Sequence, residues 1–210
     1  MNNQRYNSSM KKIIIDLLRH GDVAGGKKLL GSTDIPLSDL GWKQMSEKTR
    51  VHLPWQKIIS SDLSRCSAFS EQLAINNSIP HEIESRFREI NFGDWDGLLL
   101  SELYSGSESE QLFQFMQSPS STTPPNGEPY EAFKERVLSS WNELISSLMQ
   151  SNTEHCVLIT HGGVIRAIIS EVLSMPDTSL FNLEVPYACL SRITHYEGSP
   201  ASLSFHNSQL

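Results

Sequence analysis

The sequence predicts an α/β fold in which a mostly parallel central sheet lies between layers of helices. Short apolar runs suited to buried strands alternate with helical patterns over most of the 210 residues. No segment repeats, and the one loop-rich stretch, 118–129, is too short to link two domains. We therefore expect a three-layer sandwich forming a single domain over residues 11–210, preceded by a loose polar extension at residues 1–10.

The first half of the chain contains three predicted strands and two predicted helices. Lys12–Leu18 is rich in isoleucine and leucine, which is typical of a buried strand. A glycine-bearing loop follows to about residue 37, and Ser38 caps a predicted helix that continues to Val51, before Pro54. The other elements of this half are a strand at Lys57–Ser60, a helix at Leu63–Ile75 and a weak strand at His81–Glu84.

The clearest helical pattern follows the four prolines of the 118–129 stretch. Apolar residues recur there at spacings of three and four from Tyr130 to Leu148, and Pro129 suits a first helical turn. The remaining predicted elements are a strand at Cys156–Thr160, an apolar helix from His161 to about Leu173, and two or three strands within Leu183–Phe205.

Composition and charge exclude several classes of partner. Lysine and arginine number 17 against 24 acidic residues, and a net charge of −7 repels nucleic acid and anionic membranes. Asp16 and Arg19 interrupt the N-terminal apolar run too early for a signal peptide, and no stretch is long enough to span a membrane. Cys66, Cys156 and Cys189 have no CxxC spacing, which argues against disulfides and structural zinc. We expect a cytoplasmic protein that binds neither nucleic acid nor membrane.

Two histidines follow predicted strands at matching positions. His20 comes after the strand that ends at Leu18, His161 comes after the strand that ends at Thr160, and a glycine follows each histidine. In open α/β folds, ligands bind at the carboxyl ends of the strands, and free amides at the next helix start attract anions. Either histidine alone is more often an ordinary half-buried residue, but the matching pair favours a shared site.

Two arginines lie near these histidines or near another strand end. Arg19 adjoins His20, and Arg65 lies at the start of a predicted helix, where the helix dipole disfavours a cation. An arginine at a helix start is usually a solvated surface residue. Its unfavourable position relative to the helix dipole is also a hint that Arg65 has an anionic partner. A guanidinium fork matches the oxygens of a phosphoryl group. Together the arginines and histidines predict a cationic pocket for a phosphoryl group in an acidic protein.

Six short segments occur in an order and spacing that resemble one known family. They occupy residues 18–21, 31–38, 60–66, 88–97, 125–128 and 160–163. The tripeptide Arg-His-Gly alone is a weak signal, but the six ordered segments are highly specific. The sequence is thus identified, over roughly residues 12–195, as similar to the histidine phosphatase (phosphoglycerate mutase-like) superfamily. The resemblance implies the phosphoglycerate mutase-like version of the predicted sandwich.

The resemblance implies phosphomonoester hydrolysis through a phosphohistidine, without metal or cofactor. The matching residues are the nucleophile His20, the general acid Glu89, and the phosphate-binding Arg19, Arg65, His161 and Gly162. An imidazole attacks phosphorus only when neutral, and two adjacent guanidinium charges lower the pKa of His20. Glu89 has to be protonated to help an alkoxide leave, and the arginines neutralise the phosphoryl oxygens.

Within the family, the segment from Glu89 and the later Pro-Asn-Gly-Glu look most like alpha-ribazole phosphatases of the cobalamin pathway. Those enzymes remove the 5′-phosphate from alpha-ribazole phosphate or its cobamide precursor. Phe92 and Trp95 either offer a stacking surface to a benzimidazole or belong to the core, with equal weight. The family often has threonine and asparagine where this chain has Val23 and Gly26, so a contact at the phosphate rim is absent or supplied from elsewhere.

Three functions remain open from the sequence. A mutase or a sugar-phosphate phosphatase on the same scaffold is the alternative to an alpha-ribazole phosphatase. Mutases of the family are generally longer, so a chain whose only lid-like insertion lies at about 98–129 favours hydrolysis of a small phosphate ester. A catalytically inactive module that binds phosphorylated ligands is the third reading, but the nucleophile, the general acid and the phosphate-binding residues are all present. The oligomeric state is left open.

Overall fold

The computed structural model describes residues 10–50 and 54–207, and its centre is a six-stranded sheet in the order β3-β2-β4-β1-β5-β6. The strands are β1 (Lys12–Arg19), β2 (Lys57–Ser60), β3 (His81–Ile83), β4 (His155–Thr160), β5 (Leu190–Tyr196) and β6 (Ser202–Phe205). The pairs β1–β4, β4–β2 and β2–β3 are parallel, whereas β1–β5 and β5–β6 are antiparallel. The predicted α/β class with a mostly parallel sheet is therefore confirmed.

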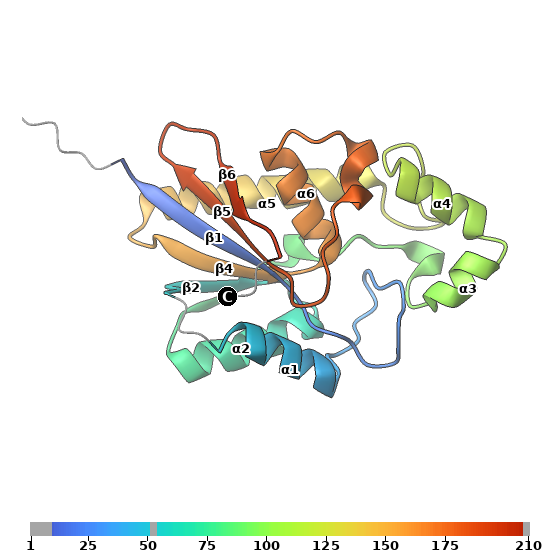
Figure 1. Cartoon of the computed structure of the whole chain (residues 1–210), viewed down its shortest axis with the longest axis horizontal. Coiled ribbons are helices and arrows are strands. Elements are labelled where there is room, and N and C mark those ends of the chain that lie inside the picture. Colours follow the sequence, from blue (N-terminus) through green and yellow to red (C-terminus); the bar gives the residue numbers. More distant parts are fainter. Residues whose placement is uncertain (1–9, 51–53, 208–210) are drawn as a thin grey trace, which may run out of the picture.

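Helices cover both faces of this sheet. Helices α1 (Asp39–Lys48) and α2 (Ser64–Asn77) lie on one side, and α5 (Tyr130–Gln150) and α6 (Gly162–Val172) lie on the other (Figure 1). The 3₁₀ turns are η1 (Ser85–Phe87), η2 (Gly93–Trp95) and η3 (Asp177–Asn182). The apolar residues of α5, spaced three and four apart, form one face of that helix and are buried against the core. This long one-sided pattern explains why the helix was the clearest one in the sequence.

Some boundaries differ from the sequence prediction. Helix α1 ends at Lys48, and its C-cap Thr49 donates its N–H and hydroxyl to the carbonyl of Met45. The predicted end at Val51 lies outside the described residues. The predicted extension also lies outside them, apart from the exposed Met10. Residues 183–189 form a loop before β5, so the tail contains two strands.

The 98–129 stretch contains two helices that the sequence analysis did not predict. They are α3 (Leu100–Ser105) and α4 (Ser109–Gln117), beyond one end of the sheet (Figure 1). Both are short, at six and nine residues, and α3 buries only Leu103 while α4 buries only Leu112 and Phe115, so neither offers a long apolar pattern. In residues 10–50 and 54–207 no helix is long and apolar enough to cross a membrane.

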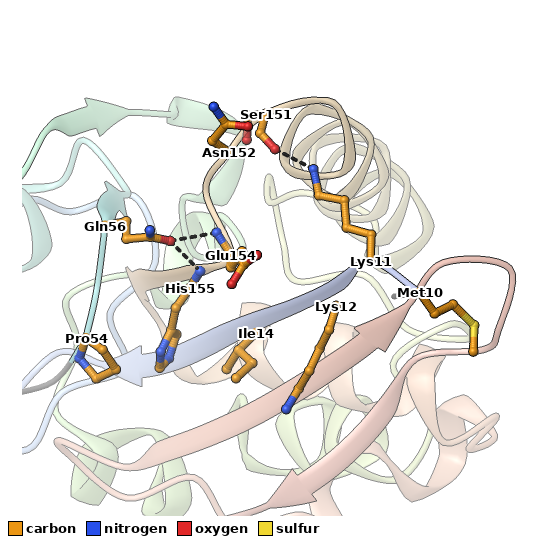
Figure 2. Close-up of a pocket in the computed structure, with 10 residues that line it drawn as sticks. All are labelled: Met10, Lys11, Lys12, Ile14, Pro54, Gln56, Ser151, Asn152, Glu154 and His155. Carbon is orange, nitrogen blue, oxygen red and sulfur yellow. Dashed lines mark hydrogen bonds between the residues drawn. The ribbon is translucent and has the colours of Figure 1, made fainter. Parts of the chain in front are cut away.

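A buried carboxylate ties the strands together at the opposite end of the sheet. Asp16 in β1 is fully buried and accepts hydrogen bonds from Trp55 Nε1 at 2.8 Å, His155 Nε2 at 2.9 Å, and Arg192 Nε and Nη2 at 2.7 and 3.0 Å. Burial alone would raise the pKa of Asp16, but these hydrogen bonds outweigh burial and lower it. Figure 2 shows His155 lining a pocket in which the side-chain oxygen of Gln56 accepts the backbone N–H groups of Glu154 and His155.

We expect Asp16→Asn to lower the free energy of unfolding by about 3 kcal/mol at neutral pH, because it leaves the Arg192 guanidinium without its buried partner. Since the pKa of Asp16 is depressed in the folded protein, its stabilisation is present above the ordinary aspartate pKa. The stabilisation is lost as the pH falls below about 4 and through the lower pKa of the folded state.

Urea denaturation at neutral and acidic pH measures this effect, and the gap between Asp16→Asn and wild type should narrow in acid. Glu82→Gln is the control, since it removes the exposed partner of Lys57 and should cost less than about 1 kcal/mol. An equally small cost for Asp16→Asn would contradict the assigned role of the cluster.

Candidate active site

The two histidines singled out in the sequence lie side by side at the carboxyl edge of the sheet. Strands β1 and β4 are parallel neighbours in which Arg19 is opposite Thr160, so each histidine follows the same point of its strand. The N–H of His20 donates to the carbonyl of Thr160 at 2.9 Å, and the ring centroids of His20 and His161 are 5.2 Å apart. The structure thus brings the two histidines together, as expected from their matching positions after the strands.

The ring of His20 is oriented by its own backbone. Its Nδ1 lies 2.8 Å from the carbonyl oxygen of Gly21, and because a carbonyl only accepts, Nδ1 carries the proton. The lone pair of the neutral ring is therefore on Nε2. Burial, and then the charges of Arg19 and Arg65, hold the pKa of His20 well below its usual value. His20 is thus a neutral, oriented imidazole at neutral pH.

Arg65 is fully buried at the start of α2 and is held by three contacts. Its Nη1 and Nη2 donate to the carbonyls of Thr33 and Gly31 at 2.8 and 2.6 Å, and its Nε donates to Nδ1 of His161 at 3.2 Å. With Nδ1 accepting, Nε2 of His161 carries the proton and donates to Ser61 Oγ at 2.8 Å. Burial, and then the charges of Arg65 and His20, hold the pKa of His161 well below its usual value.

The loop that holds Arg65 is itself folded around a carboxylate. Asp96 accepts from the backbone N–H groups of Gly31, Ser32 and Thr33 at 3.1, 2.6 and 3.2 Å. A Cβ on Gly31 would lie 2.1 Å from the carbonyl oxygen of Ile90, so only glycine permits this approach. Two of the sequence segments that carry the family resemblance therefore meet here and orient Arg65. The sequence analysis gave Asp96 no role.

Arg19 reaches the same site from the end of β1 and keeps one donor free. Its Nη1 donates to the carbonyl of Val185 at 2.6 Å, and its guanidinium carbon lies 4.4 Å from the ring centroid of Tyr187. Its buried Nε has no hydrogen-bond partner among residues 10–50 and 54–207. A buried, unpaired donor on a guanidinium is costly, and an anionic ligand would satisfy it. Tyr187 lies in a loop that the sequence analysis treated as a strand, so it was missed.

Glu89 faces the N-terminus of α6. Its Oε2 accepts from the N–H of Gly163 at 2.9 Å, and its Oε1 accepts from the N–H of Ile90 at 3.0 Å. A Cβ on Gly163 would lie 2.2 Å from Oε1, so the glycine leaves room for the carboxylate. A Cβ on Gly162 would lie 3.4 Å from Arg19 Nε, which places the first residue of α6 beside the free donor.

Arg19, His20 and Glu89 line one cavity of about 360 Å³, whereas Arg65 and His161 are fully buried and are not among its lining residues. Its charged lining residues are Arg19, Glu89, Arg166, Lys27 and Lys28, with His20 and Gly162 beside them. Its aromatic lining residues are Phe92, Tyr104, Phe115, Tyr130, Phe133, Phe181 and Tyr187. Cations outnumber the single carboxylate, so the cavity attracts anions although the chain as a whole is acidic.

The structure separates residues that the sequence treated alike. Phe92 lines the cavity, but Trp95 is fully buried and packs edge-on against Phe115 with centroids 6.1 Å apart. The stacking role considered for Trp95 is therefore wrong. Val23 is 2% exposed and pairs with Leu37, so its side chain belongs to the core.

Arg166 was also missed by the sequence analysis, although its position one turn into the helix after His161 is a signal. Its Nε donates to the carbonyl of Leu183 at 2.9 Å, and its guanidinium carbon lies 5.4 Å from the ring centroid of Phe181. Burial lowers the pKa of Arg166, as does the charge of Arg19, while the charge of Glu89 opposes both. Two like charges thus line one cavity.

The arrangement brings together a neutral imidazole, two buried guanidinium groups and a carboxylate. Within the described ranges, no group of three or more His, Cys, Asp or Glu residues could hold a metal ion. The three cysteines are free thiols and buried. The charged and nucleophilic groups are suited to transfer of a phosphoryl group, which needs positioning and neutralised oxygens more than covalent chemistry by the protein.

Comparison with known proteins agrees with this arrangement. The model of the histidine phosphatase superfamily (branch 1) matches residues 15–208. The chain is 28% identical over 198 residues to the adenosylcobalamin/alpha-ribazole phosphatase of Salmonella typhimurium, covering 92% of this chain and 95% of that protein. It is 29% identical over 168 residues to the glucosyl-3-phosphoglycerate phosphatase of Mycolicibacterium vanbaalenii, covering 76% and 74%.

A solved mycobacterial glucosyl-3-phosphoglycerate phosphatase has the same fold. It superposes with a TM-score of 0.82 at 23% identity, over 95% of this chain and 100% of that one. The family match spans nearly the whole chain, including both histidines, both buried arginines and Glu89. The chain therefore belongs to the histidine phosphatase superfamily.

Proposed function

We propose that this protein hydrolyses phosphate monoesters through a covalent phosphohistidine at His20, without a metal ion. The phosphatase names of its relatives support a phosphoric monoester hydrolase. The observation that carries the proposal is the hydrogen bond from Nδ1 of His20 to the Gly21 carbonyl, which leaves the Nε2 lone pair as the nucleophile. The free Nε–H of Arg19 beside it supports a phosphoryl group at this point.

The reaction takes place in two steps. In the first, His20 Nε2 attacks phosphorus, the P–O bond to the leaving group breaks, and Glu89 gives its proton to the leaving oxygen. In the second, Glu89 takes a proton from water, the water oxygen attacks phosphorus, and the N–P bond breaks to release phosphate. Arg19 and Arg65 neutralise the phosphoryl oxygens in both steps, and the N–H of Gly162 is a further donor. His161, whose two ring nitrogens are bound to Arg65 and Ser61, keeps the Arg65 guanidinium in place.

The helices α3 and α4 are proposed as the lid over this site. Leu100 and Tyr104 from α3, and Leu112, Phe115 and Met116 from α4, line the cavity from the 98–129 insertion. An apolar cover over the phosphoryl group strengthens the electrostatic contacts beneath it. The rest of residues 11–210 forms a single domain in this proposal, and the buried free thiols suit the reducing cytoplasm.

Alpha-ribazole 5′-phosphate is the substrate we propose first. The Salmonella relative supports it, and the aromatic lining offers several rings to a benzimidazole. We expect kcat/KM for this ester to exceed that for 3-phosphoglycerate roughly tenfold to a hundredfold, since stacking on an aromatic side chain contributes about 1–3 kcal/mol per base. The rates should be measured in EDTA and should be unchanged by it.

Glucosyl-3-phosphoglycerate is the second candidate substrate. Arg166, Lys27 and Lys28 add positive charge to the cavity beyond the two arginines that a phosphoryl group needs, and a substrate carboxylate would neutralise it. A higher kcat/KM for glucosyl-3-phosphoglycerate than for alpha-ribazole phosphate would establish this candidate instead. Activity that EDTA abolishes and Mg²⁺ or Zn²⁺ restores would contradict the whole proposal, and phosphoglycerate mutase activity would contradict its hydrolytic step.

A further inference from the structure

The segment that carries Glu89 lies outside every helix and strand. It connects the turns η1 and η2, and its carbonyl groups are bound by side chains from other elements. Arg136, in the second turn of α5, donates three hydrogen bonds to this segment and to the preceding turn η1. The acceptors are the carbonyl oxygens of Arg86, Arg88 and Glu89, at 2.7, 2.8 and 3.0 Å. Arg136 is 47 residues from Glu89 in the chain, so this contact is set by the tertiary fold.

The guanidinium of Arg136 is itself held by the carboxylate of Glu128. Its Nε and Nη2 donate to the two carboxylate oxygens of Glu128 at 2.7 and 2.8 Å. Glu128 in turn exchanges hydrogen bonds with Asn91, donating its N–H to the carbonyl at 2.8 Å and accepting the N–H of Asn91 at 3.2 Å. The pair therefore holds the chain on both sides of Glu89.

Only arginine can make this set of contacts. Arg136 forms five hydrogen bonds, and a guanidinium has five N–H donors in a planar fork. The ammonium of lysine has three donors at one point and cannot reach carbonyls and carboxylate together. The guanidinium carbon also lies 4.9 Å from the ring centroid of Phe133, which adds a packing contact.

Holding the backbone of Glu89 matters for a proton donor. The carboxylate reaches the N–H of Gly163 at 2.9 Å from an irregular segment, so a shift of that segment moves the acid relative to His20. Misplacement of a reacting group by 1 Å can cost about a hundredfold in rate.

We propose that Arg136 is a positioning residue for Glu89, which holds the acid at the distance that proton transfer to the leaving oxygen requires. The inference rests on the proposed function, in which Glu89 is the proton donor. It assigns to Arg136 a contribution to one part of the reaction, not merely to the stability of the fold.

The test compares two kinds of ester in Arg136→Lys and Arg136→Met. The alkyl ester is alpha-ribazole 5′-phosphate or glucosyl-3-phosphoglycerate, whichever has the higher kcat/KM. Its leaving oxygen needs a proton, whereas that of nitrophenyl phosphate does not. We expect phosphoenzyme formation to fall on the order of 10²-fold for the alkyl ester in Arg136→Met, with less than about a threefold loss for nitrophenyl phosphate. In a Glu89→Gln background, Arg136→Met should cause no further loss on the alkyl ester.

The matched control is Arg86→Met. Arg86 lies in the adjacent turn η1, but its guanidinium donates to the carboxylates of Glu84 and Glu143. Its loss should leave the ratio of the two rates unchanged. If Arg136→Met does not fold by circular dichroism, Glu128→Gln, which keeps the shape of the anchor and removes its charge, replaces it with the same expected selectivity.

The outcomes separate this inference from the proposed function. Equal losses on both esters in the Arg136 and Glu128 variants, or a further loss on top of Glu89→Gln, would show a merely structural role and overturn the inference alone. Equal losses on both esters in Glu89→Gln itself would overturn the assignment of the acid, and the Arg136 inference with it.

Discussion

His20→Ala should abolish phosphoenzyme formation and reduce turnover on the order of 10⁴-fold or more, the scale of loss typical of removing a nucleophile. The imidazole of His20 is neutral and its Nε2 lone pair is oriented, because Nδ1 is bound to the Gly21 carbonyl and the pKa is held low by burial and two arginines. Alanine leaves the arginines and the cavity in place but gives phosphorus no nitrogen to bind.

The measurement is acid–base stability of a radiolabelled adduct after quenching. A phosphoramidate on His20 should survive alkali and be lost in acid, and it should form in the presence of EDTA. His161→Ala is the comparison, because both nitrogens of that ring are bound, to Arg65 and Ser61, and the ring should hold Arg65 in place without forming a bond to phosphorus. Weak labelling is expected in His161→Ala, and label that persists in His20→Ala would disprove the assignment.

The site residues that could be predicted from the sequence are those that directly follow the carboxyl end of a strand or begin a helix. His20 and His161 could be paired because each follows a short apolar run, and parallel neighbouring strands end at one edge. The position of Arg65 at a helix start was likewise visible as a cation where the dipole disfavours it. These inferences needed only local patterns and one rule of α/β topology.

The contacts that orient those residues could not be predicted in the same way. Asp96 binds the loop at Gly31, 65 residues away in the sequence, and that loop in turn holds Arg65. Arg136 holds the backbone of Glu89, which is 47 residues away. Phe92 and Trp95 are both aromatic residues of one motif, and only the orientation of the η2 turn decides which one lines the cavity. The helices α3 and α4 have only six and nine residues, which is too short for a repeated apolar pattern to stand out.

Glu89→Gln should slow phosphoenzyme formation by about 10²–10⁴-fold with an alkyl phosphate, the range typical of a lost general acid. An alkyl ester leaves as a strongly basic alkoxide, so its departure depends on the proton that Glu89 supplies. A nitrophenyl ester leaves as a weakly basic phenolate that scarcely needs a proton, and with this substrate the variant should retain much of the wild-type rate. The size of the effect therefore depends on the leaving group and not on the phosphoryl group.

Glutamine suits this test because it keeps the shape of the side chain and an oxygen that can accept the N–H of Gly163. Any loss is then due to the missing proton and not to a rearranged α6. Rapid quench of the first turnover isolates the step, since the same carboxylate takes a proton from water during dephosphorylation and would obscure the steady-state rate. Losses of similar size on both esters would mean that Glu89 orients or repels the substrate, and the proton would have to come from another group.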